Sequence, residues 1–424
     1  MSLSSKVRKD PISNTMLPGT WEIGKPGFPS TLIIHNGQLF IYDENGETLI
    51  SGGKIQAGAI EADTITTNML IANAITTAKI NNENVTNTKI SRWARAKQVI
   101  VAPTLAQGDY TTIQEGINYL NNLSVGGGIL FLAPGTYYPT SDIIIGSANV
   151  DIVGLDPDLC IIDFQNTSKY IFIGVNNTQI QNVSIKRSTK SEGAIYFNQK
   201  QYCGVTNCKF SGNAYWDIKG YKVKNLNIKN CYSSQSSGFL NTSGYSEDIN
   251  IIENTIKETT SITNGSIQIN DAVNMKISNN TIRDSAGFGI LCEDNGLYNQ
   301  VQGNWISDSG SDAIRIINGP YGDFVFDSNH ILSNTGNGIY IDAIYGAIIS
   351  NNFIKDNGGD GVRLNDAQDT PINGNKISGN TGYGVRVEAG ANRTTIVGNN
   401  INSNTAGNVQ DSGSDTIDEH NNKY

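Results

Sequence analysis

Asparagine recurs along the second half of the chain at a spacing close to 24 residues. The copies are aligned on a motif of Asn, any residue and an apolar residue, with steps of 23 to 26 residues between copies. This period exceeds a single helix or strand and suits a unit of several short strands stacked on its neighbours. The alignment places Asn at residues 182, 207, 230, 254, 280, 304, 329, 352, 375 and 399.

A second apolar element follows each Asn in the five repeats that begin at residue 280. It is Gly or Ala followed by Ile or Val, nine residues after the Asn, as in Gly289-Ile290 and Gly338-Ile339. Two strands per repeat are therefore fixed in register, and the stacked Asn side chains are expected to form an amide ladder. Leucine-rich repeats share the length, but their consensus is absent. The pattern predicts an all-β right-handed parallel β-helix, about 13 coils of about 24 residues over residues 100–410.

Two other patterns lie outside the repeats. Hydroxyls at Thr111 and Thr112 precede apolar residues at helical spacing, which predicts a capped amphipathic helix over residues 111–120. Short apolar runs in residues 31–50 are separated by Asn36-Gly37 and Asn45-Gly46. Because Asn-Gly tolerates the positive φ angles of tight hairpin turns, this segment predicts a β meander.

Apolar residues recur every five positions from Ile55 to Ile90 without a miss. A period of five matches neither a helix nor a flat strand, so one such element could not bury the column. Two interpretations stay open. In the first, several chains wind together as a stalk and bury the column at a common axis. The second is a single-chain pentapeptide coil, which is disfavoured because Ala is rare two residues before each apolar position.

Composition and charge narrow the functional classes. Gly numbers 45 and Asn 53 of 424 residues, which indicates many tight turns. The formal charge is −9 and no basic run is present, so we expect no nucleic acid partner. No apolar stretch reaches the roughly 18 residues of a membrane span, and the first residues lack the apolar core of a secretory signal. Five cysteines without a CxxC pair favour reduced thiols over a disulfide scaffold or a zinc site.

Two resemblances refine these expectations. DYTTIQEGINYL, GGGILFLAPGTYY and VDIVGLD, within residues 99–164, resemble the start of pectate-lyase-like β-helix proteins, where a helix caps the open end of the solenoid. The segment SGGKIQAGAIEADTITTNMLIANAITTAKI is similar to linkers of bacteriophage tail fibre and host-specificity proteins. Together these segments resemble a phage tailspike or receptor-binding tail protein.

The resemblance implies a domain plan and a set of partners. The plan is a β meander for virion or partner attachment at 1–50, a trimerisation stalk at 51–98, the β-helix at 99–410 and a polar tail at 411–424. The expected function is recognition of a host cell-surface polysaccharide, with or without its depolymerisation, by a homotrimer. Its N-terminus would contact other tail or baseplate proteins of the virion. The protein would be made in the host cytoplasm and reside in the virion tail.

No motif of a known β-helix enzyme is found in the sequence. TTIQEGI, DFVF and QDT resemble motifs of pectin methylesterases, but QDT follows DFVF here and precedes it in that family. The Gly-His-Gly of polygalacturonases, the Asp-Pro-His of alginate epimerases and the Arg-x-Pro-x-x-Arg of pectate lyases are also absent. His35, His330 and His420 lie far apart, and His330 is expected to be a solvated strand residue. Enzymatic activity is therefore left open.

The repeat register instead predicts an outward-facing strip of polar side chains. In Gly-Ile-x-Ile-x the apolar residues point inward and each x points outward. The first outward column reads Leu291, Arg315, Tyr340, Arg363 and Arg386, and the second reads Glu293, Ile317, Asp342, Asn365 and Glu388. Arg and Tyr suit binding to acidic and apolar parts of a polysaccharide. The substrate-binding prediction is Arg315, Tyr340, Arg363 and Arg386, with Asp360 at the edge.

Three carboxylates of the strip are candidate acid and base catalysts: Asp342, Glu388 and Glu293. Asp342 lies two coils from each of the others, about 9.6 Å at the strand spacing, near the upper limit for inverting glycosidases. Ordinary solvated pairing between Arg and carboxylates across coils is the alternative. No cofactor or metal is predicted. The alternative is Ca²⁺ held by Asp-x-x-x-Asp turns, although turn-forming Asp is the commoner explanation for Asp308, Asp312, Asp356 and Asp360.

Two functions of other classes remain as alternatives to the tail protein. One is a free-standing polysaccharide lyase, hydrolase or epimerase, in which the first 98 residues are an appendage. The other is a non-catalytic structural spacer or adhesin, which a solenoid permits because its fold does not dictate a function.

Overall fold

The computed structural model describes short strands within residues 5–55, and residues 97–123, 126–293, 296–317 and 322–422. The chain divides into two compact units, residues 1–86 and 87–424. Unit 1 contains six antiparallel strands in sequential order, a β meander. The predicted stalk lies almost wholly outside the described residues. The strands of unit 1 are β1 Ser5–Lys6, β2 Thr20–Ile23, β3 Thr31–His35, β4 Gln38–Tyr42, β5 Thr48–Ser51 and β6 Lys54–Ile55.

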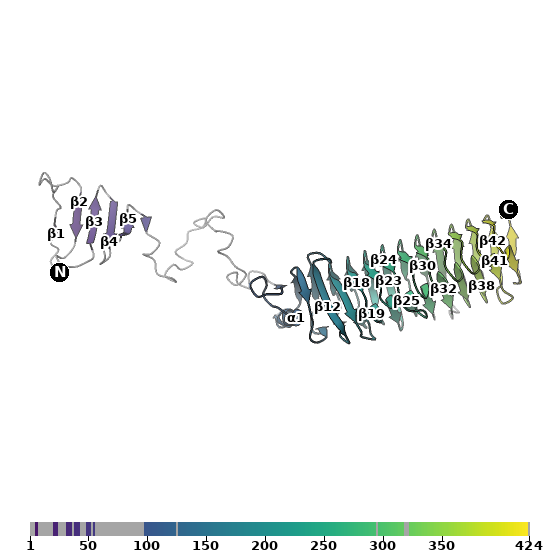
Figure 1. Cartoon of the computed structure of the whole chain (residues 1–424), viewed down its shortest axis with the longest axis horizontal. Helices are drawn as coiled ribbons and strands as arrows, with labels where there is room; N and C mark the ends of the chain where they lie inside the picture. Colours follow the sequence, from purple (N-terminus) through teal and green to yellow (C-terminus); the bar gives the residue numbers. More distant parts are fainter. Residues whose placement is uncertain are drawn as a thin grey trace. The chain divides into compact units, whose positions relative to one another are not determined.

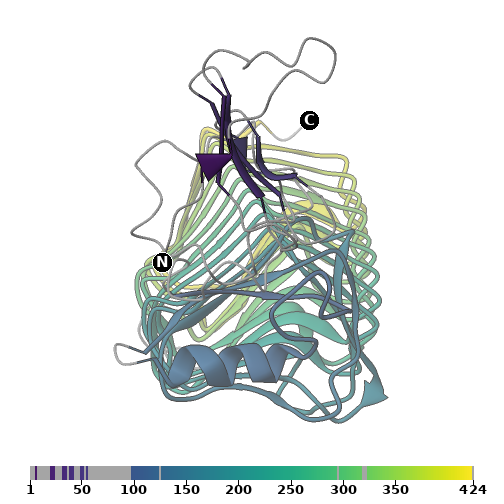
Figure 2. The ribbon, with the colours of Figure 1, turned by 90° about the vertical axis from the view of Figure 1, so that its left-hand side faces the viewer.

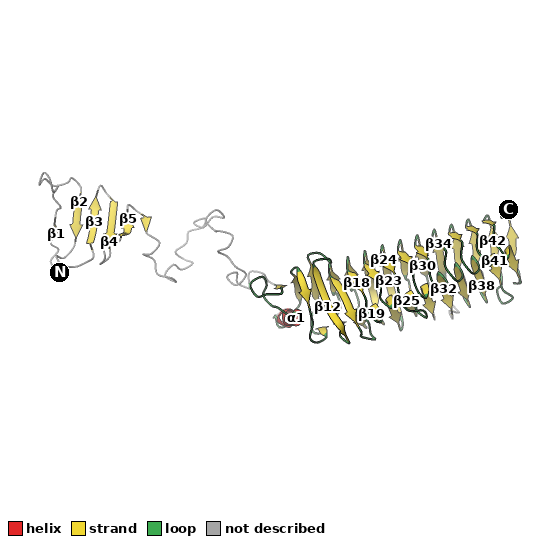
Figure 3. Ribbon diagram, in the orientation of Figure 1, coloured by secondary structure: helices red, strands yellow, loops and turns green. Residues whose placement is uncertain are grey.

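Unit 2 is a parallel β-solenoid of about twelve coils, each of which contributes strands to three sheets (Figures 1 and 3). Sheet 1 has twelve strands, each hydrogen-bonded to the corresponding strand of the next coil. They are β10 Ile143–Ile145, β13 Ile171–Ile173, β16 Ile195–Asn198, β19 Trp216–Tyr221, β22 Gly238–Ser243, β25 Gly265–Asn270, β29 Phe288–Glu293, β32 Ile314–Ile317, β35 Ile339–Asp342, β38 Val362–Asn365, β41 Tyr383–Val387 and β44 Gly407–Asp411.

Sheet 2 has fifteen strands, and fourteen of them form one continuous parallel ladder. The short strand β26 (Ala272–Val273) pairs beside this ladder with β23. The fourteen are β7 Gln98–Val101, β8 Gly128–Leu132, β11 Val150–Gly154, β14 Gln179–Gln181, β17 Gly204–Thr206, β20 Lys224–Lys229, β23 Ser246–Ile252, β27 Lys276–Ser278, β30 Asn299–Gln302, β33 Phe324–Asp327, β36 Ile348–Ser350, β39 Pro371–Asn373, β42 Thr395–Val397 and β45 Ile417–Glu419.

From residue 182 onward, sheet 3 begins in each coil at the repeated Asn, and it leads through a turn into sheet 1. It contains twelve strands. They are β9 Gly135–Tyr137, β12 Cys160–Thr167, β15 Ser184–Ser188, β18 Lys209–Ser211, β21 Tyr232–Ser234, β24 Thr255–Lys257, β28 Thr281–Arg283, β31 Trp305–Ser307, β34 His330–Leu332, β37 Phe353–Lys355, β40 Lys376–Ser378 and β43 Asn400–Asn402.

The core is a set of apolar columns that run along the solenoid. Inward positions alternate with outward ones, so β32, β35 and β38 all show a buried, intermediate, buried, intermediate pattern. Ile314, Ile339, Val362 and Val385 pair directly across successive coils and are fully buried. Since each side chain packs on its equivalent one coil away, the repeat itself builds the close-packed interior.

The predicted amide ladder is present from Asn254 onward. Within it, the side-chain oxygen of Asn329 accepts bonds from both the backbone N–H and the side-chain amide of Asn304, each at 3.0 Å. The Asn329 amide in turn donates to Asn352 and to the backbone carbonyl of Val301. Each rung therefore satisfies buried backbone and side-chain groups together, which burial in the core requires.

The first three Asn residues bond to one another as predicted, Asn207 to Asn182 and Asn230 to Asn207, but they do so outside the buried ladder, so their alignment with the later rungs was wrong. Asn182, Asn207 and Asn230 lie in turns at φ values of 57°, 51° and 53°, one position before the inward rung. In these coils the rung is occupied by the buried side chains of Val183, Cys208 and Cys231. The alignment assigned these residues to the wrong position because Asn is favoured both as a ladder amide and as a turn residue with positive φ.

A second amide ladder, which the sequence analysis missed, runs parallel to the first. It contains Asn334, Asn357, Asn380 and Asn404, each five residues after a rung of the first ladder. The oxygen of Asn357 accepts from the backbone and side-chain nitrogens of Asn334 at 3.1 and 2.9 Å. The five-residue offset was visible in the sequence and could have predicted it.

Helix α1 (Ile113–Asn121) packs against β7, β8, β10 and β11 in the first coils, and Figure 2 shows it lying across that end of the solenoid. Thr112 is the N-cap, and its hydroxyl accepts a bond from the Glu115 backbone N–H. Ile113, Ile117 and Leu120 are buried. The predicted capping helix is therefore confirmed. In the described part of the chain no helix has the length and apolar character needed to cross a membrane.

The far end of the solenoid extends beyond residue 410. Strand β45 pairs with β42, and the Asn421 side chain accepts a bond from the backbone N–H of Asn399. Residues 411–422, which we expected as a polar tail, therefore form part of the last coil. These residues pack on the solenoid because Asn421 supplies the amide that the ladder would otherwise lack at its end.

Candidate functional site

The outward columns predicted from the repeat lie in register on sheet 1. Arg315 on β32 pairs with Tyr340 on β35, Tyr340 with Arg363 on β38, and Arg363 with Arg386 on β41. Leu291 on β29 extends the first column by one coil but is only 3% exposed, so it offers little surface. In the second column Glu293 pairs with Ile317, and Asp342 with Asn365.

We call one part of this face the arginine strip. Its three arginines are about one-third exposed, with side-chain values of 34% for Arg315, 36% for Arg363 and 34% for Arg386. Long side chains held partly against a sheet lose less freedom on binding than fully solvated ones do. The strip comprises Arg315, Tyr340, Asp342, Arg363, Arg386 and Glu388.

Tyr340 lies between two guanidinium groups. The guanidinium carbon of Arg315 is 4.8 Å from the centre of the ring, and that of Arg363 is 5.6 Å from it. The Tyr340 hydroxyl donates to Asp342 at 3.3 Å. Burial and the nearby Asp342 carboxylate raise the pKa of Tyr340. A sugar could stack on this ring only by displacing one of the two arginines. The role of the Tyr340 ring is therefore to orient the guanidinium groups that lie over it.

Glu388 connects two neighbouring coils. The same carboxylate oxygen lies 2.9 Å from Nη2 of Arg363 and 2.9 Å from Nε of Arg386. Each of these ion pairs is partly exposed, so salt and water screen it and its contribution to stability is small. The two ion pairs hold the guanidinium groups of neighbouring coils close to one carboxylate.

The other two candidate catalytic carboxylates accept hydrogen bonds. Asp342 accepts a bond from the Asn365 amide at 2.7 Å. Glu293 accepts one from the Gln268 amide at 2.9 Å. Asp342 and Glu388 stand at the ends of β35 and β41, two coils apart, as the register predicted.

The turn aspartates use their oxygens within the solenoid. Asp312 accepts from the backbone N–H of Asn337 at 2.6 Å, and Asp360 accepts from that of Tyr383 at 2.6 Å. Burial raises the pKa of Asp360, while the Tyr383 N–H and the nearby Arg386 and Arg363 oppose that rise. Asp308 and Asp356 occupy turns with positive φ. Among the described residues, no three His, Cys, Asp or Glu side chains gather in a way that could hold a metal.

Two features escaped the sequence analysis. The first is an aromatic column on sheet 3, where the rings of Trp305 and His330 stack with centres 5.4 Å apart, and Phe353 follows at 5.8 Å. His330 is exposed as expected but stacks on a neighbour.

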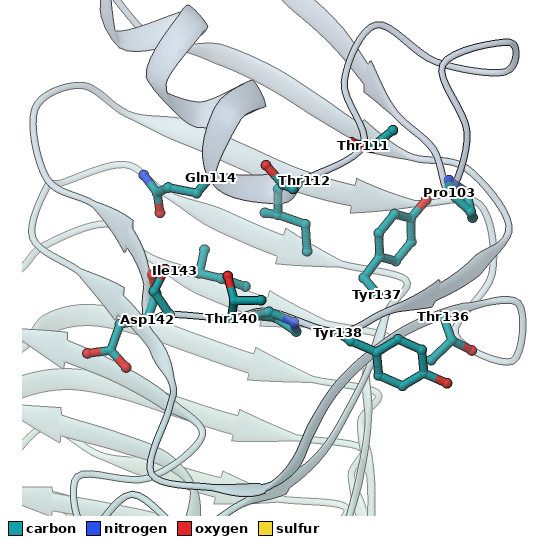
Figure 4. Close-up of a pocket in the computed structure, with 13 residues that line it drawn as sticks. Pro103, Thr111, Thr112, Gln114, Thr136, Tyr137, Tyr138, Thr140, Asp142 and Ile143 are labelled. Carbon is teal, nitrogen blue, oxygen red and sulfur yellow. Dashed lines mark hydrogen bonds between the residues drawn. The ribbon is translucent and has the colours of Figure 1, made fainter.

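The second feature is a cavity of about 410 Å³ between α1 and the segment from Thr136 to Ile143 (Figure 4). Its residues come from separate loops without a shared period, so no sequence signal joined them.

Comparison with known proteins identifies the architecture. The sequence model of the family described as "Right handed beta helix region" matches residues 170–321 and 298–423. This match confirms the right-handed β-helix predicted from the repeats. No curated protein sequence matches the chain.

Solved structures show the same fold. The catalytic domain of a GH87 α-1,3-glucanase in complex with nigerose aligns with a TM-score of 0.58 and 14% identity, over 75% of this chain and 65% of its own. The Dettilon tailspike protein aligns with a TM-score of 0.55 and 15% identity, over 74% of this chain and 68% of its own. At these identities the similarity concerns the fold.

Proposed function

Because the chain belongs to the right-handed β-helix family, whose fold alone does not define an activity, we propose that its function is polysaccharide recognition along the arginine strip. The observation that carries this proposal is the ladder of Arg315, Tyr340, Arg363 and Arg386 on four successive coils. The coils rise by about 4.8 Å each, close to the length of a pyranose ring, so an extended glycan can follow them.

The chemistry of the strip favours an acidic glycan. Each guanidinium carries five N–H donors, and the ion pairs with Asp312 and Glu388 use only some of them. The remaining donors can bind sugar hydroxyls or the carboxylates of uronate or sialate units. Because Glu388 and Tyr340 already hold the guanidinium groups in place, binding costs little side-chain entropy.

The finer proposal is a phage or prophage tail protein that binds a host surface polysaccharide. Three observations support it: the period-five column from Ile55 to Ile90, the β-helix that follows, and the same fold in a tailspike protein. Residues 51–98 would form the trimer stalk. The N-terminal unit would join other virion tail or baseplate proteins, and the protein would reside in the virion tail after synthesis in the host cytoplasm.

A second candidate function is cleavage of the bound glycan. Asp342 and Glu388 stand within the strip, two coils apart, where an acid and a base for hydrolysis or elimination could act on a chain lying across them. The solved α-1,3-glucanase domains in complex with tetrasaccharides share the fold and support this candidate.

The test is a binding screen of the intact chain against capsular and wall polysaccharides from many bacteria, followed by assays for new reducing ends and unsaturated uronates. We expect Arg363→Ala to weaken binding to the recognised glycan. Arg283→Ala is the matched control, because Arg283 is an exposed arginine on sheet 3. Equal binding by the wild type and both variants would contradict the strip as the binding site.

The assembly has its own test. Light scattering of the intact chain should give the mass of a trimer, and deletion of residues 51–98 should give a monomer. A monomeric intact chain would contradict the stalk and favour a free-standing enzyme or spacer.

A further inference from the structure

The cavity beneath α1 has the shape and lining of a small-molecule site. The ring of Tyr137 and the side chain of Ile143 supply an apolar floor, while side chains from the start of α1 and from Thr136 to Asp142 surround it (Figure 4). A volume of about 410 Å³ falls within the range of ligand pockets in proteins. An apolar floor with a polar rim complements a pyranose, which has apolar C–H faces and a hydroxylated edge.

The rim carries polar groups that have no hydrogen-bond partner within the protein. Within the described part of the chain, this holds for the hydroxyls of Thr111, Thr136 and Thr140 and for the carboxylate of Asp142. Other lining groups are engaged: Tyr137 donates to the carbonyls of Val101 and Ala133. The arginine strip differs, since its carboxylates are all paired. Free donors and acceptors that converge on a cavity are those a ligand can use without breaking existing bonds.

The charge of the cavity limits the class of ligand. No Lys or Arg lines it, and Asp142 is its one ionisable acid. An anionic sugar would face the Asp142 carboxylate, and the Lys169 ammonium at the edge of the cavity is already bonded to the Pro139 carbonyl at 2.9 Å, which disfavours such a sugar. Hydroxyl and carboxylate groups together suit a ligand that both donates and accepts hydrogen bonds, as a neutral sugar does.

We propose that this cavity binds a neutral pyranose, as a monosaccharide or as one to two units of a longer glycan. This site goes beyond the proposed function, because it lies in the first coils and differs in charge preference from the arginine strip. A chain with both sites would hold a neutral segment at the N-terminal end of the solenoid and an acidic segment on the later coils.

The experiment uses the intact chain and methyl glycosides of glucose, galactose, mannose and N-acetylglucosamine, with methyl glucuronide as the acidic probe. Saturation-transfer NMR detects binding, and titration gives the affinity. We expect at least one neutral glycoside to bind and the glucuronide to bind less well. Thr140→Val removes one hydroxyl at constant shape and should weaken binding about fivefold, the effect of one hydrogen bond. Ser141→Trp, at an exposed position, should fill the cavity and abolish binding.

Two controls separate this site from the strip. Thr281→Val makes the same change on the outer face of sheet 3 and should leave binding of the neutral glycoside unchanged. Arg363→Ala should also leave it unchanged, so loss of the strip and loss of the cavity are distinguishable. The proposal is overturned if no neutral glycoside binds the wild type, or if Thr140→Val and Ser141→Trp both bind as the wild type does.

Discussion

The guanidinium of Arg315 lies 4.8 Å from the centre of the Tyr340 ring, one coil away along the solenoid. Arg363 covers the same ring from the following coil at 5.6 Å. The aromatic residue in the middle of the strip is therefore a support for two arginines. We therefore expect glycan binding to depend on the ring and little on the hydroxyl.

Tyr340→Ala should weaken glycan binding severalfold, because each lost cation–π contact is worth about 0.5–1 kcal/mol and the freed arginines regain side-chain entropy. Tyr340→Phe retains the ring, loses only the bond to Asp342 and should bind nearly as the wild type does. Calorimetric titration with a glycan that the parent recognises measures both. Strong loss in the Phe variant would instead assign the binding contribution to the hydroxyl.

The amide ladder should carry much of the stability of the later coils. Asn329→Ala leaves the Asn304 backbone N–H without its acceptor in the core and removes the Asn329 amide that donates to the Val301 carbonyl. The Asn304 amide loses one of its two acceptors and keeps the Ile277 carbonyl. We expect a loss of about 3 kcal/mol, since unsatisfied buried groups cost roughly 1–3 kcal/mol each and partial relaxation recovers some of it. Urea unfolding followed by circular dichroism measures the change.

Asn207→Gly is the matched control for the ladder. Asn207 lies in a turn at φ 51°, where Gly is tolerated, and its side chain donates to Asn182 and accepts from Asn230 outside the buried ladder. This variant should lose less than about 1 kcal/mol. An equal loss of stability in both variants would show that the buried Asn329 amide stabilises the fold no more than the Asn207 amide in its turn does.

The buried carboxyl of Asp217 should make stability fall as pH rises. Its side chain accepts bonds from the Asn213 amide at 2.7 Å and from the Ser233 hydroxyl, and burial raises its pKa to about 7. The folded state therefore retains the proton while the unfolded state releases it near pH 4. The contribution of Asp217 to stability is greatest below that value and declines up to about pH 7. Asp217→Asn should flatten this decline in a series of unfolding midpoints against pH.

Asp327 should give the opposite sign. Bonds from Asn351, Ser350, Ser328 and Gln302 oppose desolvation and lower its pKa. Its contribution is present above the unfolded pKa and is lost as pH falls through the folded one. Asp327→Asn should therefore change the acid limb of the curve and leave the range from pH 4 to 7 as in the wild type. If the decline in stability between pH 4 and 7 persists in Asp217→Asn, a group other than Asp217 causes it.

All five cysteines should resist thiol reagents in the native state. Cys160, Cys203, Cys208, Cys231 and Cys292 are free and buried. Burial raises the pKa of Cys292 to about 12 and also raises those of Cys203 and Cys231, so little thiolate, the reactive form, exists at neutral pH. Titration with a chromogenic disulfide should detect no thiol natively and five after unfolding in guanidinium. Rapid native reaction would contradict this burial.

The sequence by itself determined the solenoid and the register of its sheets. Repeated Ile and Val must face the core, so Gly289-Ile290 and Gly338-Ile339 could pair with their equivalents in only one way. The same constraint placed Arg315, Tyr340, Arg363 and Arg386 in one outward column. Periodic burial is a local property of the chain, which is why pattern alone sufficed.

Only the tertiary structure decided how the side chains use that scaffold. Asn207 and Asn329 were aligned to the same position of the repeat, yet one holds a turn and the other a buried rung, because both positions favour Asn. The covered faces of Tyr340 depend on rotamers of residues a coil away. The cavity beneath α1 joins Thr111 to Thr140 across two loops without a period. Contacts between aperiodic segments have no spacing in the sequence to reveal them, so only the folded chain brings them together.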